Sequence, residues 1–220
     1  MKEDIFSYNE AVSFGWETMK KNIKFFVILL FIALLIVELP GFIGDLAKKQ
    51  GLTFVGIVLM TAGVILNFVV KLGFIRISLN FCDGVTSEFD ELLSSFSLLT
   101  NYIWATILYV LIIVGGLVLF IVPGCIWAVK FNLFSYFMVE KGLGPIESLK
   151  ASALATEGAK WDLATFGVLM LLINVAGFLC FIVGLFATIP TTMLAYAYVY
   201  RKLAARAALL NGPMPLNPEI

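Results

Sequence analysis

The sequence predicts an all-α polytopic membrane protein with six transmembrane helices, arranged as three hairpins that each follow an interfacial amphipathic helix. Of the 220 residues, 61% are hydrophobic and 14% are charged, whereas a soluble globular domain is about half apolar and about a quarter charged. The mean hydropathy is +1.00, and the apolar residues form blocks long enough to cross a bilayer. Short, more polar segments precede these blocks three times.

The apolar blocks set the number of spans. The last block, Leu163–Tyr200, has 38 residues and no charge, so one helix over it would measure about 57 Å. A bilayer core is about 30 Å thick, and the block must therefore fold back as two helices. The predicted spans are then Ile23–Leu39, Leu52–Leu72, Tyr102–Val122, Cys125–Val139, Leu163–Phe181 and Leu185–Lys202.

Breaks between the spans predict how the helices pair. Pro123 and Gly124 separate the third span from the fourth, and Gly184 separates the fifth from the sixth. Each of these pairs is therefore expected to form a tight antiparallel hairpin. The first pair has a longer connection, Pro40–Gly51, which carries one carboxylate and two lysines.

Lysine and arginine residues orient the spans, because they are enriched in cytoplasmic loops. Leaving out Lys130, which falls inside a span, twelve basic residues lie on one side of the predicted helices. Only two, Lys48 and Lys49, lie on the other side. The side with twelve is expected to be cytoplasmic, and it includes both termini.

Three polar segments indicate an internal repeat. They are SYNEAVSFGWETMKKNIKF, SEFDELLSSFSLLTNYIWA and GPIESLKASALATEGAKWDL. Apolar residues recur at three- and four-residue steps, most weakly in the third, which is typical of one helical face; Pro145 suits a first helical turn. Such helices are expected to lie in the cytoplasmic interface. The chain, 1–220, is then one membrane domain of three parallel units, approximately 5–84, 85–142 and 143–212.

The residue inventory argues against several chemistries. The sequence has no histidine, which removes Ser-His and Cys-His nucleophiles, HExxH zinc sites and histidine proton relays. The cysteines Cys82, Cys125 and Cys180 show no CxxC spacing, so neither a metal nor a redox site is predicted. The net charge is zero, and nothing favours nucleic acid as a partner. We expect a protein that is not an enzyme and needs no cofactor.

Lys130 stands out because it lies inside an apolar span. One central lysine costs about 2.5–3.5 kcal/mol on insertion, which nearly cancels the gain from the apolar residues of that span. Lys130 lies about 8 Å from the outer end of the predicted helix, and two interpretations stay open. Either its ammonium reaches the interface or pairs with a carboxylate such as Glu38, or it lines a cavity for an anionic lipid head group or solute.

Further polar residues extend the candidate site. Glu38 is expected at the outer end of the first span. The candidate ligand-binding residues inside or beside the spans are Lys130, Asn132, Glu38, Asn67 and Asn174. Basic residues near predicted cytoplasmic helix ends are expected to contact lipid phosphates. These are Lys71, Arg76, Arg201 and Lys202.

Most of the chain is similar to a group of bacterial membrane proteins. The segments EAVSFGWETMKKNIKFF, RISLNFCDG, VPGCIWAVKFNLFSYFMVEKGLGPIESLKAS and IPTTMLAYAYVYRKL resemble the DUF975 family, the YciC-like (UPF0259) proteins and the membrane domain beside some glycerophosphodiester phosphodiesterases. The resemblance implies a multi-span protein of the bacterial inner membrane. It implies no activity, because the phosphodiesterase chemistry resides in a separate domain that uses histidines. Where this group usually has a large aromatic residue, the third interfacial segment has Ala153, and looser docking is expected there.

Two functions fit these features. The first is a non-catalytic scaffold or accessory subunit that binds membrane lipids or another membrane protein, either a different one or a second copy of this chain. The second is a small transporter or lipid-handling permease with an anionic ligand near Lys130. The polar groups of a transporter should converge on one cavity, whereas those of a scaffold should lie apart.

Overall fold

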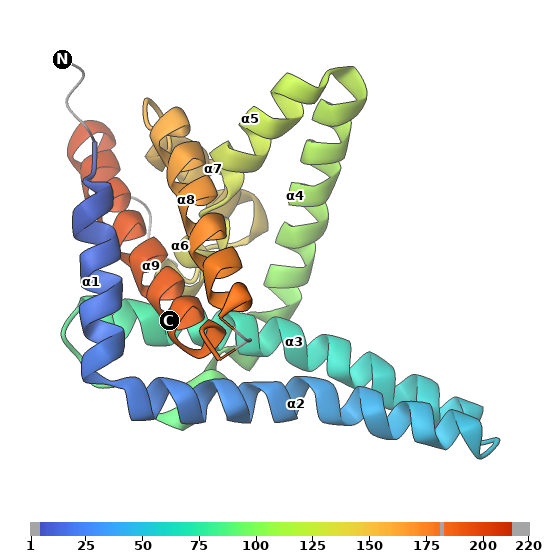
Figure 1. Ribbon diagram of the computed structural model, residues 1–220. Helices are drawn as coiled ribbons and strands as arrows, with labels where there is room; N and C mark the ends of the chain where they lie inside the picture. Colours follow the sequence, from blue (N-terminus) through green and yellow to red (C-terminus); the bar gives the residue numbers. More distant parts are fainter. Residues whose placement is uncertain (1–4, 181–182, 213–220) are drawn as a thin grey trace.

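The computed structural model describes residues 5–180 and 183–212. Over these residues the protein is helical and contains no strand (Figure 1), so the predicted all-α class is confirmed. The α-helices are α1 (Tyr8–Lys21), α2 (Ile23–Lys49), α3 (Thr53–Cys82), α4 (Leu99–Leu119), α5 (Ile121–Phe131), α6 (Phe134–Lys141), α7 (Pro145–Ala155), α8 (Lys160–Leu179) and α9 (Leu185–Asn211). Two short 3-10 helices, η1 (Phe89–Leu92) and η2 (Ser94–Leu98), precede α4.

Five helical stretches of the described chain are long and apolar enough to cross a bilayer, which identifies a membrane protein. They are Ile23–Lys49, Thr53–Cys82, Phe89–Leu119, Ile121–Lys141 and Lys160–Leu179. The sixth predicted span, Leu185–Lys202, is helical within α9 but less apolar, because threonines, tyrosines and two basic residues interrupt it. α9 packs against α1, α2, α3, α7 and α8, so protein covers much of its surface.

The first hairpin, α2 and α3, is longer than predicted. The connection predicted over Pro40–Gly51 is wrong, because α2 passes through its proline and ends at Lys49. α3 likewise runs past the predicted end at Leu72 as far as Cys82. Proline is tolerated inside membrane helices, where neighbouring helices and local adjustments satisfy the freed backbone groups.

Glycines hold this hairpin together. A Cβ added to Gly44 would lie 2.8 Å from the Gly56 carbonyl oxygen, and one added to Gly63 would lie 3.2 Å from the Val37 carbonyl oxygen. Small residues let membrane helices approach closely, and van der Waals packing between them replaces the missing hydrophobic drive. The glycine contacts therefore extend the pairing beyond the boundaries predicted from hydropathy.

The second hairpin turns earlier than predicted. α4 and α5 separate at Phe120 rather than at Pro123 and Gly124. Pro123 instead lies in the first turn of α5, where the missing N–H leaves no intrahelical bond unmade. Gly124 packs against α4, because a Cβ added there would lie 2.8 Å from the Leu117 backbone nitrogen.

The predicted fourth span, Cys125–Val139, is not one helix, because the chain breaks between α5 and α6. Two hydroxyls, that of Ser152 on α7 and that of Thr156 directly after this helix, satisfy the backbone groups that this break exposes. Ser152 Oγ accepts from the Leu133 N–H (3.1 Å) and donates to the Lys130 carbonyl (3.0 Å), and Thr156 Oγ1 lies 2.9 Å from the same carbonyl oxygen. Unpaired buried backbone groups are costly, so α7 stabilises the break.

The third hairpin is α8 and α9. The predicted break at Gly184 is confirmed, whereas Phe181, the predicted end of the fifth span, lies outside the described residues. A Cβ added to Gly184 would lie 2.8 Å from the Gly177 Cα, so the two helices meet closely at this end.

The three amphipathic segments differ in structure. The first and third are helices, α1 and α7, as predicted. The second is not an α-helix but forms η1 and η2, with a non-helical residue, Ser95, inside η2. α7 docks firmly despite the small Ala153, because Leu149 and Ala155 on its inner face are buried.

Each short segment packs against the second helix of a hairpin that is not its own. η1 lies on α3, and α7 lies on α6. α1 lies beside α9 (Figure 1). A Cβ added to Gly73 of α3 would lie 2.6 Å from the Leu92 carbonyl carbon, and one added to Gly15 of α1 would lie 3.2 Å from the Ala195 nitrogen. Figure 1 also shows α2 and α3 side by side and steeply inclined to α1 and α4.

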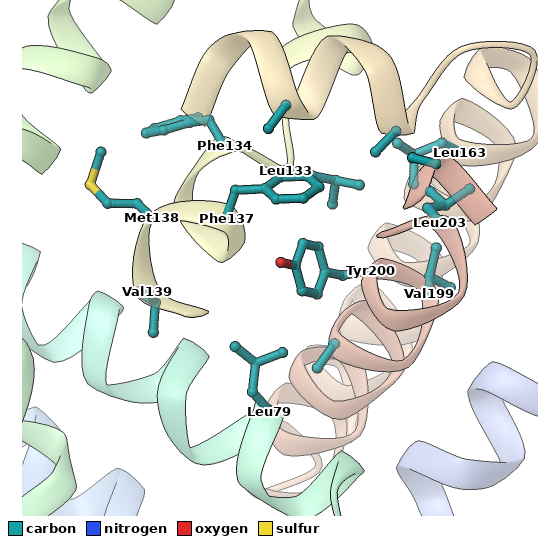
Figure 2. Packing of buried hydrophobic residues seen from close by; sticks show 14 of the residues in the cluster. Leu79, Leu133, Phe134, Phe137, Met138, Val139, Leu163, Val199, Tyr200 and Leu203 are labelled. Carbon is teal, nitrogen blue, oxygen red and sulfur yellow. The ribbon is translucent and has the colours of Figure 1, made fainter. Parts of the chain in front are cut away.

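The main core lies where α3, α6 and α9 meet. Figure 2 shows Tyr200 of α9 between Phe137 of α6 and Leu79 of α3. The Tyr200 and Phe137 ring centroids are 4.9 Å apart in an edge-to-face contact. A second buried cluster, which includes Phe26 and Leu194, joins α2 to α9. α9 therefore contributes to both clusters.

An ionic cluster joins the same three helices. Arg201 of α9 pairs with Asp83, the residue after α3 (Nη2 to Oδ2, 2.5 Å), and with Glu140 of α6. The Tyr200 hydroxyl donates to the second carboxylate oxygen of Glu140. The guanidinium group presents several donors in a planar fork, so one side chain holds a helix end from each of the other two hairpins.

Gly73→Ala should destabilise the protein by about 1–3 kcal/mol, because a methyl group has no room beside η1. Gly115→Ala is the matched control, since a Cβ at this glycine of α4 meets nothing within 4 Å. Thermal unfolding of the detergent-purified variants measures the difference. Equal midpoints for the two variants would contradict the close approach of η1 to α3.

Arg201→Gln should lower the free energy of unfolding by about 1–3 kcal/mol, because two carboxylates lose a charged hydrogen-bond partner. Arg206→Gln is the control, since the guanidinium of Arg206 donates to a single backbone carbonyl, that of Glu157. Chemical denaturation in detergent compares them. A loss no larger for Arg201→Gln than for the control would mean that the ionic cluster contributes little.

Candidate functional site

Three of the predicted polar residues lie around one groove. The groove has a volume of about 500 Å³ and runs between α2, α3 and the start of α9. Glu38, Asn67 and Lys71 are its polar lining residues, and all three are exposed. Asn67 and Lys71 are one helical turn apart and therefore share a face of α3. All the other lining side chains are apolar.

Glu38 and Lys71 lie further from the helix ends than predicted. α2 continues for eleven residues beyond Glu38, and α3 for eleven beyond Lys71, which is about 16 Å in each case. The helix ends predicted close to Glu38 and Lys71 are therefore wrong. Charged side chains this far inside a membrane helix are costly and commonly functional.

A more polar chamber of about 490 Å³ also borders Lys71, between α3, α4, α6 and α9. Lys71 and Phe74 line both the groove and the chamber. The other chamber residues with a hydroxyl or amide group are Ser78, Tyr102, Thr106, Tyr109, Asn132, Ser135, Tyr136 and Tyr196. The break after α5 thus places Asn132 in a chamber with Lys71, although Lys130 is its close neighbour in the sequence.

Lys130 lies at a third hollow, of about 350 Å³, where the end of α5 meets α7 and the start of α8. The other charged residues around it are Lys150, Glu157 and Lys160. Three lysines and one glutamate therefore line this hollow. Ala153 also lines this hollow, and its small side chain leaves room that a large aromatic residue would occupy.

The surroundings of Lys130 exclude the pairing with Glu38 that was considered above. Within the described residues Lys130 pairs with no carboxylate, and Glu38 lines a different hollow, so that pairing is not formed. The Lys130 ammonium lies 5.4 Å from the Phe131 ring centroid. It shares its hollow with Lys150 and Lys160 and lies in the last turn of α5.

Asn174 connects two helices instead of lining a hollow. Its Nδ2 donates to the Met170 carbonyl oxygen (3.0 Å) and to Thr192 Oγ1 (3.3 Å). The second bond links α8 to α9. Asn174 borders neither the groove, the chamber nor the Lys130 hollow, which indicates a structural role.

The four predicted head-group residues are found in different settings. Lys71 borders the groove, and Arg201 is held by two carboxylates. Arg76 donates to a serine hydroxyl of η2 at 3.4 Å. The exposed Lys202 has its ammonium 5.3 Å from the Tyr198 ring centroid. Of the four, Lys202 has the surroundings that best fit the predicted contact with lipid phosphate.

Lys150 and Lys160 are partners of Lys130 that sequence reasoning missed. They follow it by 20 and 30 residues, and only the break after α5 brings them to one hollow. Ser152 and Thr156, one turn apart on α7, are the signal in the sequence, because two hydroxyls on one helical face can bond to a broken neighbouring helix.

No family model, curated protein or solved structure matches the chain. Among the described residues, no three His, Cys, Asp or Glu side chains lie close enough together to hold a metal ion. The groove, the chamber and the basic hollow are thus the features from which a function can be derived.

Proposed function

We propose that the chain is a six-span protein of the bacterial inner membrane with both termini in the cytoplasm. The ionic cluster supports this topology, because it joins the ends of α3 and α6 to Arg201 of α9. These three points then lie on one side of the membrane. If α8 leaves that side, α9 must return to it, which makes α9 the sixth crossing.

The composition of α9 is compatible with a crossing. Leu194, Ala195, Val199 and Tyr200 are fully buried in the protein. A helix that other helices surround does not need an apolar surface on every side, because little of it meets lipid. The hydroxyls of Thr191 and Thr192 donate to backbone carbonyls of the same helix.

The threefold parallel repeat is part of the same proposal. Each short segment lies on the second helix of the preceding unit, and α1 closes the ring on α9. This cyclic packing supports three units around one axis. Kinship with the DUF975 group is proposed on the sequence segments that resemble it.

Single cysteines in a cysteine-free variant test the topology. In spheroplasts, a membrane-impermeant maleimide should label Gln50→Cys but neither Thr86→Cys nor Asn211→Cys, all three of which replace exposed residues. Permeabilised membranes, in which all three should react, are the control. Labelling of Asn211→Cys together with Gln50→Cys, while Thr86→Cys stays protected, would establish an odd number of spans.

For the function, we propose a non-catalytic scaffold or accessory subunit that binds anionic lipid head groups on the cytoplasmic side. The convergence of Lys130, Lys150 and Lys160 on one hollow carries this proposal. Each lysine near a membrane surface attracts anionic lipid by about 1 kcal/mol. With a single carboxylate, Glu157, beside them, the net charge of the hollow favours an anion.

A small transporter or lipid-handling permease is the second candidate. The observation in its favour is that Glu38, Asn67 and Lys71 border one groove in the middle of two long helices. The remaining candidates, Asn132, Asn174 and Lys130, lie elsewhere. The polar groups therefore converge only in part, which favours the binding protein over the transporter.

Replacing Lys130, Lys150 and Lys160 together by glutamine should weaken phosphatidylglycerol binding at this hollow by about a hundredfold, because three lysine–phosphate attractions are lost. Native mass spectrometry of the full chain, titrated with this lipid in detergent, measures the change. The matched control is the triple replacement of Lys20, Lys21 and Lys24, which are exposed on α1 and α2. Equal losses in the two triple variants would mean that the hollow is not a site.

A further inference from the structure

Lys71 has a position that the proposed head-group site does not explain. It lies inside α3, far from both helix ends, and its side chain is exposed. The ion pairs of the described residues belong to Arg201, and Lys71 is in none of them. Because a lysine in this setting is costly, a ligand of opposite charge would stabilise it.

The two hollows that meet at Lys71 differ in chemistry. In the groove, Glu38 and Asn67 are the other polar residues among the described lining side chains, and the rest of these are aliphatic or aromatic. The chamber carries eight hydroxyl or amide side chains, including Asn132 and Ser135. Their volumes, about 500 and 490 Å³, both fall in the range of small-molecule sites. A ligand that fits both must therefore have an apolar part and a polar part.

Glu38 lies at the far end of the groove. Val37 packs against Gly63 in the antiparallel hairpin, so Glu38 lies opposite Ala62, nine residues before Lys71. This separation is about 13 Å along α3. The two residues are thus attached to the hairpin at different levels of the groove.

We propose that the groove and chamber together bind one anionic lipid. Its phosphate binds the Lys71 ammonium, its hydroxyl-bearing head group occupies the chamber, and its hydrocarbon chain lies in the groove. A protein helix is a poor occupant, because a piece only 13 Å long and 10 Å wide takes up on the order of 1,000 Å³. This site is separate from the Lys130 hollow and does not depend on it.

Native mass spectrometry of the purified full chain tests the site with phosphatidylglycerol as the probe. Lys71→Gln should lower its affinity by about fivefold or more, as expected for one lost lysine–phosphate contact. Glu38→Gln, which neutralises the other charge of the same groove, should bind at least as well as the wild type. Lys71→Arg, which keeps the charge, should retain most of the binding.

Three further probes separate the parts of the ligand. Phosphatidylcholine, which has no net charge, should bind more weakly than phosphatidylglycerol, and the difference should become smaller in Lys71→Gln, which keeps only the Lys130 hollow as a site for anionic head groups. Glycerol 3-phosphate, which lacks the chain, should not compete at equal concentration. Asn132→Leu should reduce the preference for phosphatidylglycerol over phosphatidic acid, whose head group has no hydroxyls.

Several results would overturn the proposal. One is an unchanged phosphatidylglycerol affinity in Lys71→Gln. Another is a loss of affinity in Glu38→Gln as large as that in Lys71→Gln, and a third is full competition of glycerol 3-phosphate with phosphatidylglycerol. Thermal unfolding of each variant identifies a loss of binding that comes from misfolding. If Lys71→Gln misfolds, a loss of binding in a properly folded Lys71→Arg would contradict the proposal. Because the Lys130 triple variant keeps Lys71, binding lost only in that variant would overturn this site while supporting the other.

Discussion

The arrangement of the three hairpins depends on the guanidinium group of Arg201. Apolar helices in a bilayer gain nothing from leaving lipid for one another, so their association relies on close packing and on polar contacts. Arg201 supplies the polar contacts for all three hairpins, since it pairs with Asp83 after α3 and Glu140 on α6 while standing on α9. Tyr200, the residue before Arg201 on α9, packs its ring against Phe137. The ionic cluster and the main core are therefore adjacent on α9.

Close backbone contact supplies the other part of the association. Gly15 and Gly73 each lie where a short segment meets the second helix of another hairpin, and a Cβ at either position would overlap the neighbouring backbone. The short segments therefore act as spacers between hairpins, because each contacts one hairpin and leads directly into the next. This explains how α2 and α3 can incline steeply to α4 (Figure 1) and still belong to one body.

Hydropathy predicts the class and the approximate spans, because the length of an apolar block is a property of the sequence alone. The helix ends follow less directly. In soluble proteins a proline such as Pro40 usually ends a helix. Here α2 continues past Pro40, and Gly44 and Gly56 allow it to stay in close contact with α3. The two errors for Glu38 and Lys71 have the same origin, since both residues were placed by helix ends that the structure extends.

The break after α5 shows why the candidate site is harder to predict than the fold. No local sequence signal marks the end of the helix at Asn132, and the hydroxyls of Ser152 and Thr156, distant in the sequence, satisfy the Lys130 carbonyl oxygen that the break leaves free. α7 also carries Lys150. The backbone of Lys130 and the helix that bears Lys150 are therefore fixed to each other before any ligand arrives. A site whose supporting backbone is already ordered loses less conformational entropy on binding, so the bonds that stabilise the break also prepare the hollow beside it.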